Sequence, residues 1–371
     1  MLPELAGRLL AKWSELGLPG ERPSKLQFLQ VAGPEESAAT ILLFVFRPGA
    51  RRPVALAKVR RSPGADEALL REAAVLRSLR ELLGKSTGQL CSGQALLPHE
   101  VSDSIPRVLD VCEVWAQRAL VLEASEGASL GQQIARGWLV RRDARLRRAV
   151  RIGMDWLCAF QQATRKADVV VEGELLERHA IGPIRRYSDR LEAGPEKESL
   201  ARLCDSVGEA LHGTPLFLCW RHGDLRPGNI LRHRNRLTVV DWEHAEEEAL
   251  PSLDAALFAA SAPAECTYRR GELVDYVSVF RETWLSATPM HDVVVGGLAR
   301  YATIMGVGAE AVVWGLPIAL ATRALADRPG ADQGRWGECL QLLAEDPGAL
   351  QRMGEAVSAL RGEGTPLTAR P

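Results

Sequence analysis

The sequence predicts an α+β protein in two parts: a small antiparallel sheet with one main helix, then a larger, mostly helical part. Short apolar runs separated by turns dominate the chain up to Glu123, whereas apolar residues at helical spacing dominate it afterwards. The length of 371 residues is too great for one small core and suits one large two-lobed domain or two domains. We expect an N-lobe over residues 1–123 and a C-lobe over residues 124–371.

The N-terminal part is expected to run from a first helix through three strands and a main helix to two further strands. The expected helices cover residues 5–16 and 67–83, and the expected strands cover residues 26–31, 40–46, 54–59, 106–114 and 119–123. Turn-forming residues at 32–37 and 47–50 separate the first three strands. Small residues at 125–129 mark the expected boundary to the second part.

The second part is expected to be mostly helical. The expected helices cover residues 130–137, 146–163, 183–191, 198–211, 253–260, 271–287 and much of 293–360. A cassette of strand, loop and strand interrupts them between residues 216 and 240. The most apolar late segment, 311–322, contains Pro317 and is too short to cross a bilayer, so it predicts a buried helix pair.

The composition is ordinary for a globular protein, and the net charge is close to zero. Hydrophobic residues make up 46% and charged residues 25%, and the net charge is -1, so nothing indicates nucleic acid or an anionic membrane as a partner. The seven cysteines form no CxxC pair, which suggests neither a zinc site nor a disulfide framework. The N-terminus lacks a signal-peptide pattern. We expect a soluble, cytoplasmic protein without a membrane span; its oligomeric state stays open.

The polar residues that carry the chemistry lie in the segments RHGDLRPGNIL (221–231) and VVDWE (239–243). Asp224 is followed five residues later by Asn229, and Asp241 lies twelve residues beyond Asn229. Carboxylate and amide oxygens are hard ligands of the kind that magnesium prefers, and a further carboxylate can accept a hydroxyl proton. The order predicts that Asp224 orients a hydroxyl while Asn229 and Asp241 hold magnesium against a polyphosphate.

Two of these three residues also have a simpler structural explanation. Asp224 could cap a turn, and Asn229 could form an Asx turn. Asp241 ends an apolar strand, where a buried carboxylate without a cation is costly, and a bound metal removes that objection. The joint spacing of the three residues favours catalysis.

The stretch His222-Gly223-Asp224-Leu225, with Pro227 and Asn229, resembles the catalytic loop of the aminoglycoside phosphotransferase and choline kinase family. Asp241-Trp242-Glu243 stands where that family has its metal-binding Asp-aromatic segment. The family is the small-molecule branch of the protein-kinase-like fold. The resemblance implies a bilobal fold and magnesium-dependent transfer of the γ-phosphoryl group of ATP or GTP to a hydroxyl of a small molecule.

The resemblance also implies nucleotide-binding residues in the N-lobe. Lys58, at the end of the third strand, fits the phosphate-positioning lysine, and Glu72 on the following helix fits its ion-pair partner. Glu67 is the competing partner, and an edge-strand lysine that faces water is the simpler explanation. Glu123, at the lobe junction, is expected at a hinge whose backbone binds the nucleotide base.

Two positions depart from the family pattern. The turn between the first two strands offers Gly33, Pro34 and two glutamates in place of a Gly-x-Gly-x-x-Gly loop. In addition, Arg226 stands where relatives often carry Lys, His or Gln. The degenerate turn supports a rival interpretation, a catalytically silent kinase-fold scaffold that binds nucleotide, which the intact catalytic and metal residues oppose. Phosphorylation of protein serines is disfavoured by Gly223 and by the lack of an Ala-Pro-Glu segment.

Further polar residues surround the cassette. We expect His222 to orient the loop and Asp254 to cap a helix or brace the loop. The acidic run Glu246–Glu248 could attract a cationic acceptor, although a solvated charged face is the favoured interpretation. A sugar-like acceptor is favoured over an aminoglycoside, because no strongly acidic acceptor site is evident in the C-lobe. The identity of the acceptor and the choice between ATP and GTP stay open.

Overall fold

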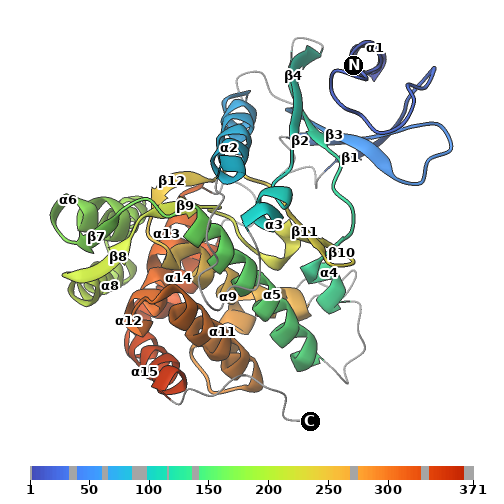
Figure 1. The fold of residues 1–371 in the computed structure, drawn as a ribbon. Coiled ribbons are helices and arrows are strands. Elements are labelled where there is room, and N and C mark those ends of the chain that lie inside the picture. The colour runs from blue at the N-terminus through green and yellow to red at the C-terminus, as the bar shows by residue number, and fades with distance from the viewer. Residues whose placement is uncertain are drawn as a thin grey trace. The chain divides into compact units, whose positions relative to one another are not determined.

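The computed structural model of the chain describes residues 2–32, 40–60, 66–85, 98–114, 117–135, 142–267, 275–326 and 334–362 (Figure 1). The chain forms two compact units. The sheet unit comprises Met1–Ser86, Ser102–Ala128 and Leu231–His244, and the helical unit comprises Thr87–Val101, Ser129–Ile230 and Ala245–Pro371. The segment that carries Asp241 therefore belongs to the sheet unit, although it lies far along the chain.

The sheet unit is built on a five-stranded sheet in which every neighbouring pair is antiparallel, in the order β1-β2-β3-β5-β4. Its strands are β1 (Gln27–Ala32), β2 (Thr40–Phe46), β3 (Pro53–Arg60), β4 (Val108–Val114) and β5 (Gln117–Glu123). Its helices are α1 (Leu2–Ala11) and α2 (Asp66–Lys85). The chain passes between the units within α3 (Pro98–Asp103), β6 (Ala128–Ser129) and β10 (Ile230–His233), and β11 (Arg236–Val239) pairs with β10.

Apolar residues of α1 and the sheet form the core of the sheet unit. Leu5 and Leu9, one turn apart on α1, are fully buried in one cluster with Leu43 and Val45 of β2 and Val121 of β5. Helix α2 packs on β4 and β5 through a stripe at helical spacing. The buried residues of α2 are Leu69, Glu72, Ala73, Val75, Leu76, Leu79 and Leu83. Glu72 is the charged member of that set, and a fully buried glutamate requires a partner.

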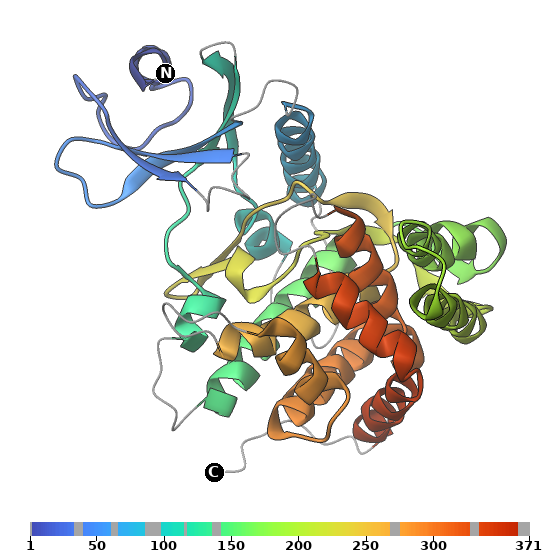
Figure 2. The same ribbon diagram turned by 180° about the vertical axis from the view of Figure 1, so that it is seen from behind.

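The helical unit is mainly a bundle of helices, drawn in green to red in Figures 1 and 2. The helices are α4 (Leu130–Ala135), α5 (Arg142–Ala163), α6 (Gly173–Leu176), α7 (Gly182–Ser188), α8 (Pro195–Leu211), α9 (Ser252–Thr267), α10 (Tyr276–Trp284), α11 (Pro289–Met305), α12 (Ala309–Val313), α13 (Gly315–Ala326), α14 (Arg335–Glu345) and α15 (Gly348–Gly362). A π-helical turn, η2 (Glu177–Ile181), joins α6 to α7, and η3 (Pro227–Asn229) is a 3-10 turn.

Two small antiparallel ribbons complete the helical unit. In the first, β7 (Asp168–Val171) pairs with β8 (Thr214–Phe217); in the second, β9 (Cys219–Arg221) pairs with β12 (Glu246–Ala249). Helix α9 lies at the centre of the bundle, in contact with α4, α5, α10, α11 and α13. Residues 252–264 of this helix are all buried and most of them are apolar, as expected of a helix enclosed by other helices.

The structure confirms the predicted fold class, with an antiparallel sheet followed by a mostly helical part. The predicted strand at 40–46 coincides with β2, and the predicted helix at 67–83 differs from α2 by one or two residues at its ends. The first helix was expected to extend to residue 16 but ends at Ala11, after which the chain forms turns. The Gly33 turn lies outside the described residues.

Four short strands, β6, β7, β9 and β12, were not predicted from the sequence. Strand β12 contains the acidic run Glu246–Glu248. Three consecutive glutamates show no alternation of apolar and polar residues, so the sequence does not predict a strand there. Glu246 lies directly across from Arg221 of β9 and forms an ion pair with it at 2.6 Å. Opposite charges on facing strands stabilise such a pair.

One stretch of the described chain, Ala309–Ala326, is long and apolar enough to cross a membrane by length and composition. In the structure, 72% of this window is buried, and it is divided into α12 and α13. Such burial is typical of core helices in globular proteins, as predicted for the segment around Pro317.

Candidate active site

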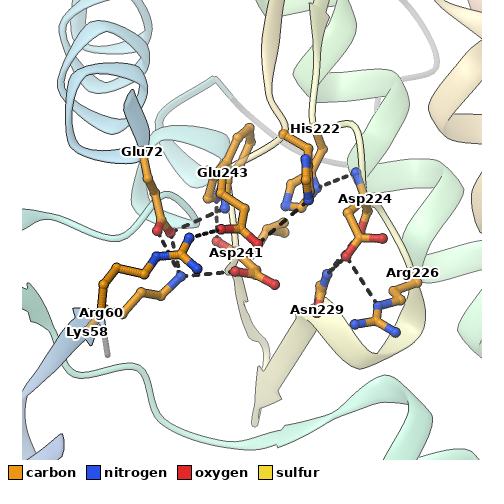
Figure 3. Close-up of polar contacts among 12 residues, drawn as sticks. Lys58, Arg60, Glu72, His222, Asp224, Arg226, Asn229, Asp241 and Glu243 are labelled. Atoms are coloured by element: carbon orange, nitrogen blue, oxygen red, sulfur yellow. Dashed lines mark hydrogen bonds and ion pairs between the residues drawn. The ribbon is translucent and has the colours of Figure 1, made fainter. Parts of the chain in front are cut away.

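The sheet unit holds a buried cluster of charges around Lys58. Lys58 lies on β3, the central strand of the sheet, so the alternative of a water-facing edge lysine does not apply. Its side chain is only 10% exposed, and its Nζ donates to Glu72 Oε1 at 2.7 Å and to Oε2 at 2.9 Å (Figure 3). Glu67, the competing partner, is exposed. The structure therefore pairs Lys58 with Glu72.

Asp241 is the second carboxylate on Lys58. Its Oδ1 accepts from Lys58 Nζ at 3.0 Å. The backbone of Asp241 is left-handed, with φ 72°, a region that Asp tolerates better than most residues other than glycine. The next residue fixes this turn, because the N–H of Trp242 donates to Glu72 Oε1 at 3.3 Å and its buried indole donates to the Val239 carbonyl at 2.8 Å.

A second ion pair adjoins the first. Arg60 Nη2 lies 2.5 Å from Glu243 Oε2, and the ring of His244 lies 3.6 Å from the other oxygen of Glu243. The cluster of Lys58, Arg60, Glu72, Asp241 and Glu243 thus joins two cations to three carboxylates. This surplus of negative charge suits a bound metal cation.

The protonation of the cluster follows from burial and from the contacts of Lys58. Burial alone would lower the pKa of Lys58, but Asp241 and Glu72 outweigh this and raise the pKa. Burial raises the pKa of Glu72 more than its contact with Lys58 lowers it. Lys58 is therefore a fixed cation at neutral pH, suited to binding an anion such as phosphate.

In the helical unit, the predicted catalytic residues lie on the loop 222–229, which follows β9 and ends in η3. Asp254, in the first turn of α9, accepts from the N–H of His222 at 2.6 Å and from the N–H of Gly223 at 3.0 Å. Gly223 has φ +77°, which a residue with a Cβ rarely adopts. The carboxylate of Asp254 is only 1% exposed and braces the loop, as one of the two predicted alternatives stated.

Asp224 and Asn229 are held together on this loop. The amide of Asn229 donates to the backbone carbonyl of Asp224 at 2.9 Å and to its Oδ2 at 3.1 Å. The N–H of Asp224 donates to His222 Nδ1 at 3.2 Å, so His222 orients the loop as predicted. Asp224 and Asn229 are 4% and 6% exposed, which fixes their side chains.

Several charged residues that sequence reasoning did not single out for the site surround Asp224. Arg323, on α13, lies with Nε 3.5 Å from Asp224 Oδ1, and Arg226 Nε lies 3.5 Å from Oδ2. Glu265, near the end of α9, accepts from the N–H of Gly228 at 3.1 Å. No local motif identifies Arg323 or Glu265, because each reaches the loop from a distant helix.

The donor atoms fit magnesium. The amide nitrogen of Asn229 is engaged by Asp224, so its Oδ1 is the candidate ligand atom, and Asp241 offers a carboxylate in the negatively charged cluster. Among the described residues, no group of three His, Cys, Asp or Glu side chains could enclose a metal ion. Magnesium that is held largely by substrate phosphates needs only one or two protein oxygens.

Glu123 ends β5, where its backbone N–H donates to the Arg107 carbonyl at 2.9 Å. Its side chain is 54% exposed and lies 3.7 Å from Arg107 Nε. This N–H is therefore engaged within the sheet unit. The predicted role of Glu123 at a nucleotide-binding hinge stays a prediction.

Comparison with known proteins supplies the family. A model of the APH family, described as the phosphotransferase enzyme family, matches residues 44–278, more than half of the chain. The chain belongs to this family. Membership of this phosphotransferase family agrees with the resemblance seen in the 222–229 loop. No curated protein sequence matches the chain.

Solved structures of small-molecule kinases are similar to this APH-family chain at low identity. Aminoglycoside phosphotransferase APH(4)-Ia has 13% identity over 92% of this chain and 95% of that one, with a TM-score of 0.47. A choline/ethanolamine kinase family protein from Mesorhizobium loti has 16% identity over 97% and 100% of the two chains, with a TM-score of 0.45. A glucosamine kinase has 16% identity over 93% and 95%, with a TM-score of 0.39.

Proposed function

We propose that this APH-family enzyme transfers the γ-phosphoryl group of ATP or GTP to a hydroxyl of a small molecule in a magnesium-dependent reaction. The observation that carries the proposal is the buried Asp224 carboxylate, held by the Asn229 amide on a loop that Asp254 braces. A carboxylate fixed in this way needs only hydrogen-bond reach to the acceptor hydroxyl.

In the proposed step, the acceptor oxygen forms a bond to the γ-phosphorus while the bond from that phosphorus to the bridging oxygen breaks. The hydroxyl proton passes to the carboxylate of Asp224, and the nucleotide leaves as its diphosphate. Because the transition state of phosphoryl transfer is loose, positioning of the acceptor contributes more than removal of its proton.

The sheet unit supplies the nucleotide-binding residues in this proposal. Lys58 contacts the phosphates, and Glu72 holds its ammonium group in place. Glu123, at the end of β5, stays the proposed neighbour of the nucleotide base. The division into a nucleotide-binding N-lobe over 1–123 and an acceptor-binding C-lobe over 124–371 is part of the proposal.

Magnesium is assigned to Asn229 and Asp241. When bound, it neutralises negative charge on the polyphosphate during transfer. Asp224 engages the amide nitrogen of Asn229 at 3.1 Å, and Lys58 engages Oδ1 of Asp241 at 3.0 Å. Each ligand side chain is therefore oriented by a protein partner before a metal binds.

The proposal is tested with magnesium and ATP or GTP against pooled sugars, amino alcohols and aminoglycosides, with products identified by mass. Asp224→Asn should lower the rate of transfer by about 10²- to 10⁴-fold, the usual contribution of a positioned acid–base group. Asp205→Asn, an exposed residue on α8, is the matched control and should keep full activity.

The rival scaffold hypothesis makes a different prediction in the same assay. A silent scaffold would bind ATP tightly, as measured by calorimetry, and would transfer phosphate to no pool. Phosphate that appears in products equally with wild type and Asp224→Asn would contradict the role of Asp224.

A further inference from the structure

Two arginines contact opposite oxygens of the Asp224 carboxylate. Arg226 Nε lies 3.5 Å from Oδ2, and Arg323 Nε lies 3.5 Å from Oδ1 (Figure 3 shows Arg226 beside Asp224). Arg226 belongs to the loop itself, whereas Arg323 projects from α13 with a side chain only 10% exposed. Two separate elements thus bring guanidinium groups to the proposed catalytic base.

A third arginine lies in the same region. The guanidinium of Arg335, on α14, lies 5.3 Å from the ring centroid of Tyr276 and 4.9 Å from that of Trp336. These two rings pack edge to face at 5.0 Å, so they give Arg335 a rigid support. Arg335 and Arg226 both act electrostatically on the carboxylate of Glu265, and both lower its pKa against the larger effect of burial, which raises it.

The nearby carboxylate Glu265 and the acidic run Glu246–Glu248 contact other groups than the Asp224 side chain. Glu265 contacts the loop through the N–H of Gly228. The acidic run on β12 is engaged elsewhere: Glu246 pairs with Arg221 at 2.6 Å, and Lys166 reaches Glu247 at 2.6 Å. The run is therefore a paired surface strand, and the charges that contact Asp224 itself are guanidinium groups.

Arginine is the side chain best suited to bind an anionic group on a substrate. A guanidinium carries five N–H donors in a planar fork that matches carboxylate and phosphate oxygens. It can contact Asp224 through Nε and an anion of the acceptor through its other nitrogens. An amine-rich acceptor would instead bring ammonium groups against two guanidinium groups beside the reacting hydroxyl, which is repulsive.

We propose that the acceptor is a small hydroxyl compound that also carries an anionic group, a carboxylate or a phosphate, bound by Arg323 and Arg226 beside Asp224. This inference rests on the proposed function and narrows it. The sequence favoured a sugar-like acceptor, and this inference specifies a sugar-like compound that carries an acidic group. An aminoglycoside is disfavoured.

The test uses three acceptor pools with magnesium and ATP: acidic compounds (sugar acids, sugar phosphates and hydroxy acids), neutral sugars and polyols, and cationic amino sugars and aminoglycosides. We expect Asp224-dependent phosphate transfer to be at least about tenfold greater in the acidic pool. Transfer mainly to the neutral or cationic pool would overturn the inference and leave the proposed function standing. Transfer to no pool would overturn the proposed function itself.

Within the acidic pool, glucuronate and glucose 6-phosphate are then assayed separately as probes of carboxylate and phosphate recognition. Arg323→Gln should raise KM for the preferred acidic acceptor by about 10- to 100-fold, because the anionic group of the acceptor loses its buried guanidinium partner. KM for the nucleotide should stay unchanged. Arg323→Lys, which keeps the charge without the fork, should recover part of the loss.

Because Arg323 is buried, thermal unfolding of each variant is measured as well, and Arg226→Gln, at a more exposed side chain, provides a second variant. Arg352→Gln on α15, whose partner Asp346 is exposed, is the matched control. If the Arg226 and Arg323 variants raise KM equally for acidic and neutral acceptors, the arginines only position Asp224 and the inference fails.

Discussion

At the scale of single residues, Lys58 is stabilised as a buried cation by two carboxylates at once. Glu72 binds it through both oxygens and is itself almost inaccessible, whereas the Asp241 side chain is 36% exposed. The two carboxylates therefore differ in how well water could solvate them if Lys58 were removed. Asp241 can turn to water, but Glu72 cannot, so removal of Lys58 leaves a buried charge uncompensated.

This difference predicts the stability of variants at the pair. Lys58→Met should lower the free energy of unfolding by about 3–5 kcal/mol, and adding Glu72→Leu should recover much of that loss. Urea denaturation measures both. Lys85→Met, at an exposed pair with Glu81, should cost about 0–1 kcal/mol. A double variant as unstable as the sum of its single variants would contradict the ion pair as the cause.

Asp254 is a buried carboxylate with a different kind of partner. It accepts two backbone N–H groups of the 222–229 loop, yet burial outweighs these bonds and raises its pKa. A carboxyl group whose folded pKa is raised holds its proton longer in the folded state than in the unfolded state. Its contribution to stability is therefore full below the unfolded pKa and is lost as pH rises through the folded pKa.

Asp254→Asn removes this titration. The unfolding free energy of the wild type minus that of the variant should fall as pH rises, by up to about 1.4 kcal/mol per pH unit within the window between the two pKa values. Chemical denaturation from about pH 4 to about pH 8 measures the difference. A difference that grows with pH would mean that the folded pKa of Asp254 is lowered.

At the scale of elements, neighbouring glycines on α11 have opposite surroundings. A Cβ on Gly297 would lie 2.4 Å from Val150 Cγ1 of α5, while a Cβ on Gly296 would have no heavy atom within 4 Å. Val150 is β-branched and has little rotamer freedom on a helix. Gly297 therefore permits the close approach of α11 to α5, whereas Gly296 has no such role.

Alanine at the two positions should change stability in opposite directions. Gly297→Ala should cost about 1–3 kcal/mol through overpacking. Gly296→Ala should add about 0.5–1 kcal/mol, because glycine loses more backbone entropy on folding than alanine does. Thermal unfolding of both variants is the measurement. Equal shifts in the same direction would show that α11 and α5 can move apart at little cost.

At the scale of the whole molecule, the proposed functions belong to different compact units. Lys58, Glu72 and Asp241 lie in the sheet unit, and Asp224, Asn229 and Arg323 lie in the helical unit. Between Asn229 and Asp241 the chain passes from the helical unit to the sheet unit, after Ile230. Nucleotide and acceptor binding should therefore respond to different variants.

We expect a separation of kinetic effects. Lys58→Met should impair use of the nucleotide, seen in kcat/KM for ATP, while KM for the acceptor stays near that of the wild type. Arg323→Gln should give the converse. Initial rates with each substrate varied in turn measure both. If each variant raised both KM values alike, the assignment of one substrate to each unit would fail.

The sequence was informative where the signal is local. The apolar run that forms β2 and the apolar stripe of α2 depend on residues close in sequence. The partnership of Lys58 with Glu72 was expected from the family resemblance, and the structure shows it. The expected Asp254 brace is also present. Strands β6, β7, β9 and β12 were missed, because strands of two to four residues gain their stability from partners distant in the chain.

The spacing of Asp224, Asn229 and Asp241 in one short cassette predicts the class of reaction, phosphoryl transfer, without any tertiary information. The sequence by itself also determined most elements, since helical and strand periodicities are properties of adjacent residues. Only the tertiary structure brought Arg323 of α13 to the carboxylate of Asp224. No local pattern states which helix faces which loop, because that choice depends on how all the apolar faces pack together. The proposed acidic acceptor therefore follows from packing, whereas phosphoryl transfer follows from the motif.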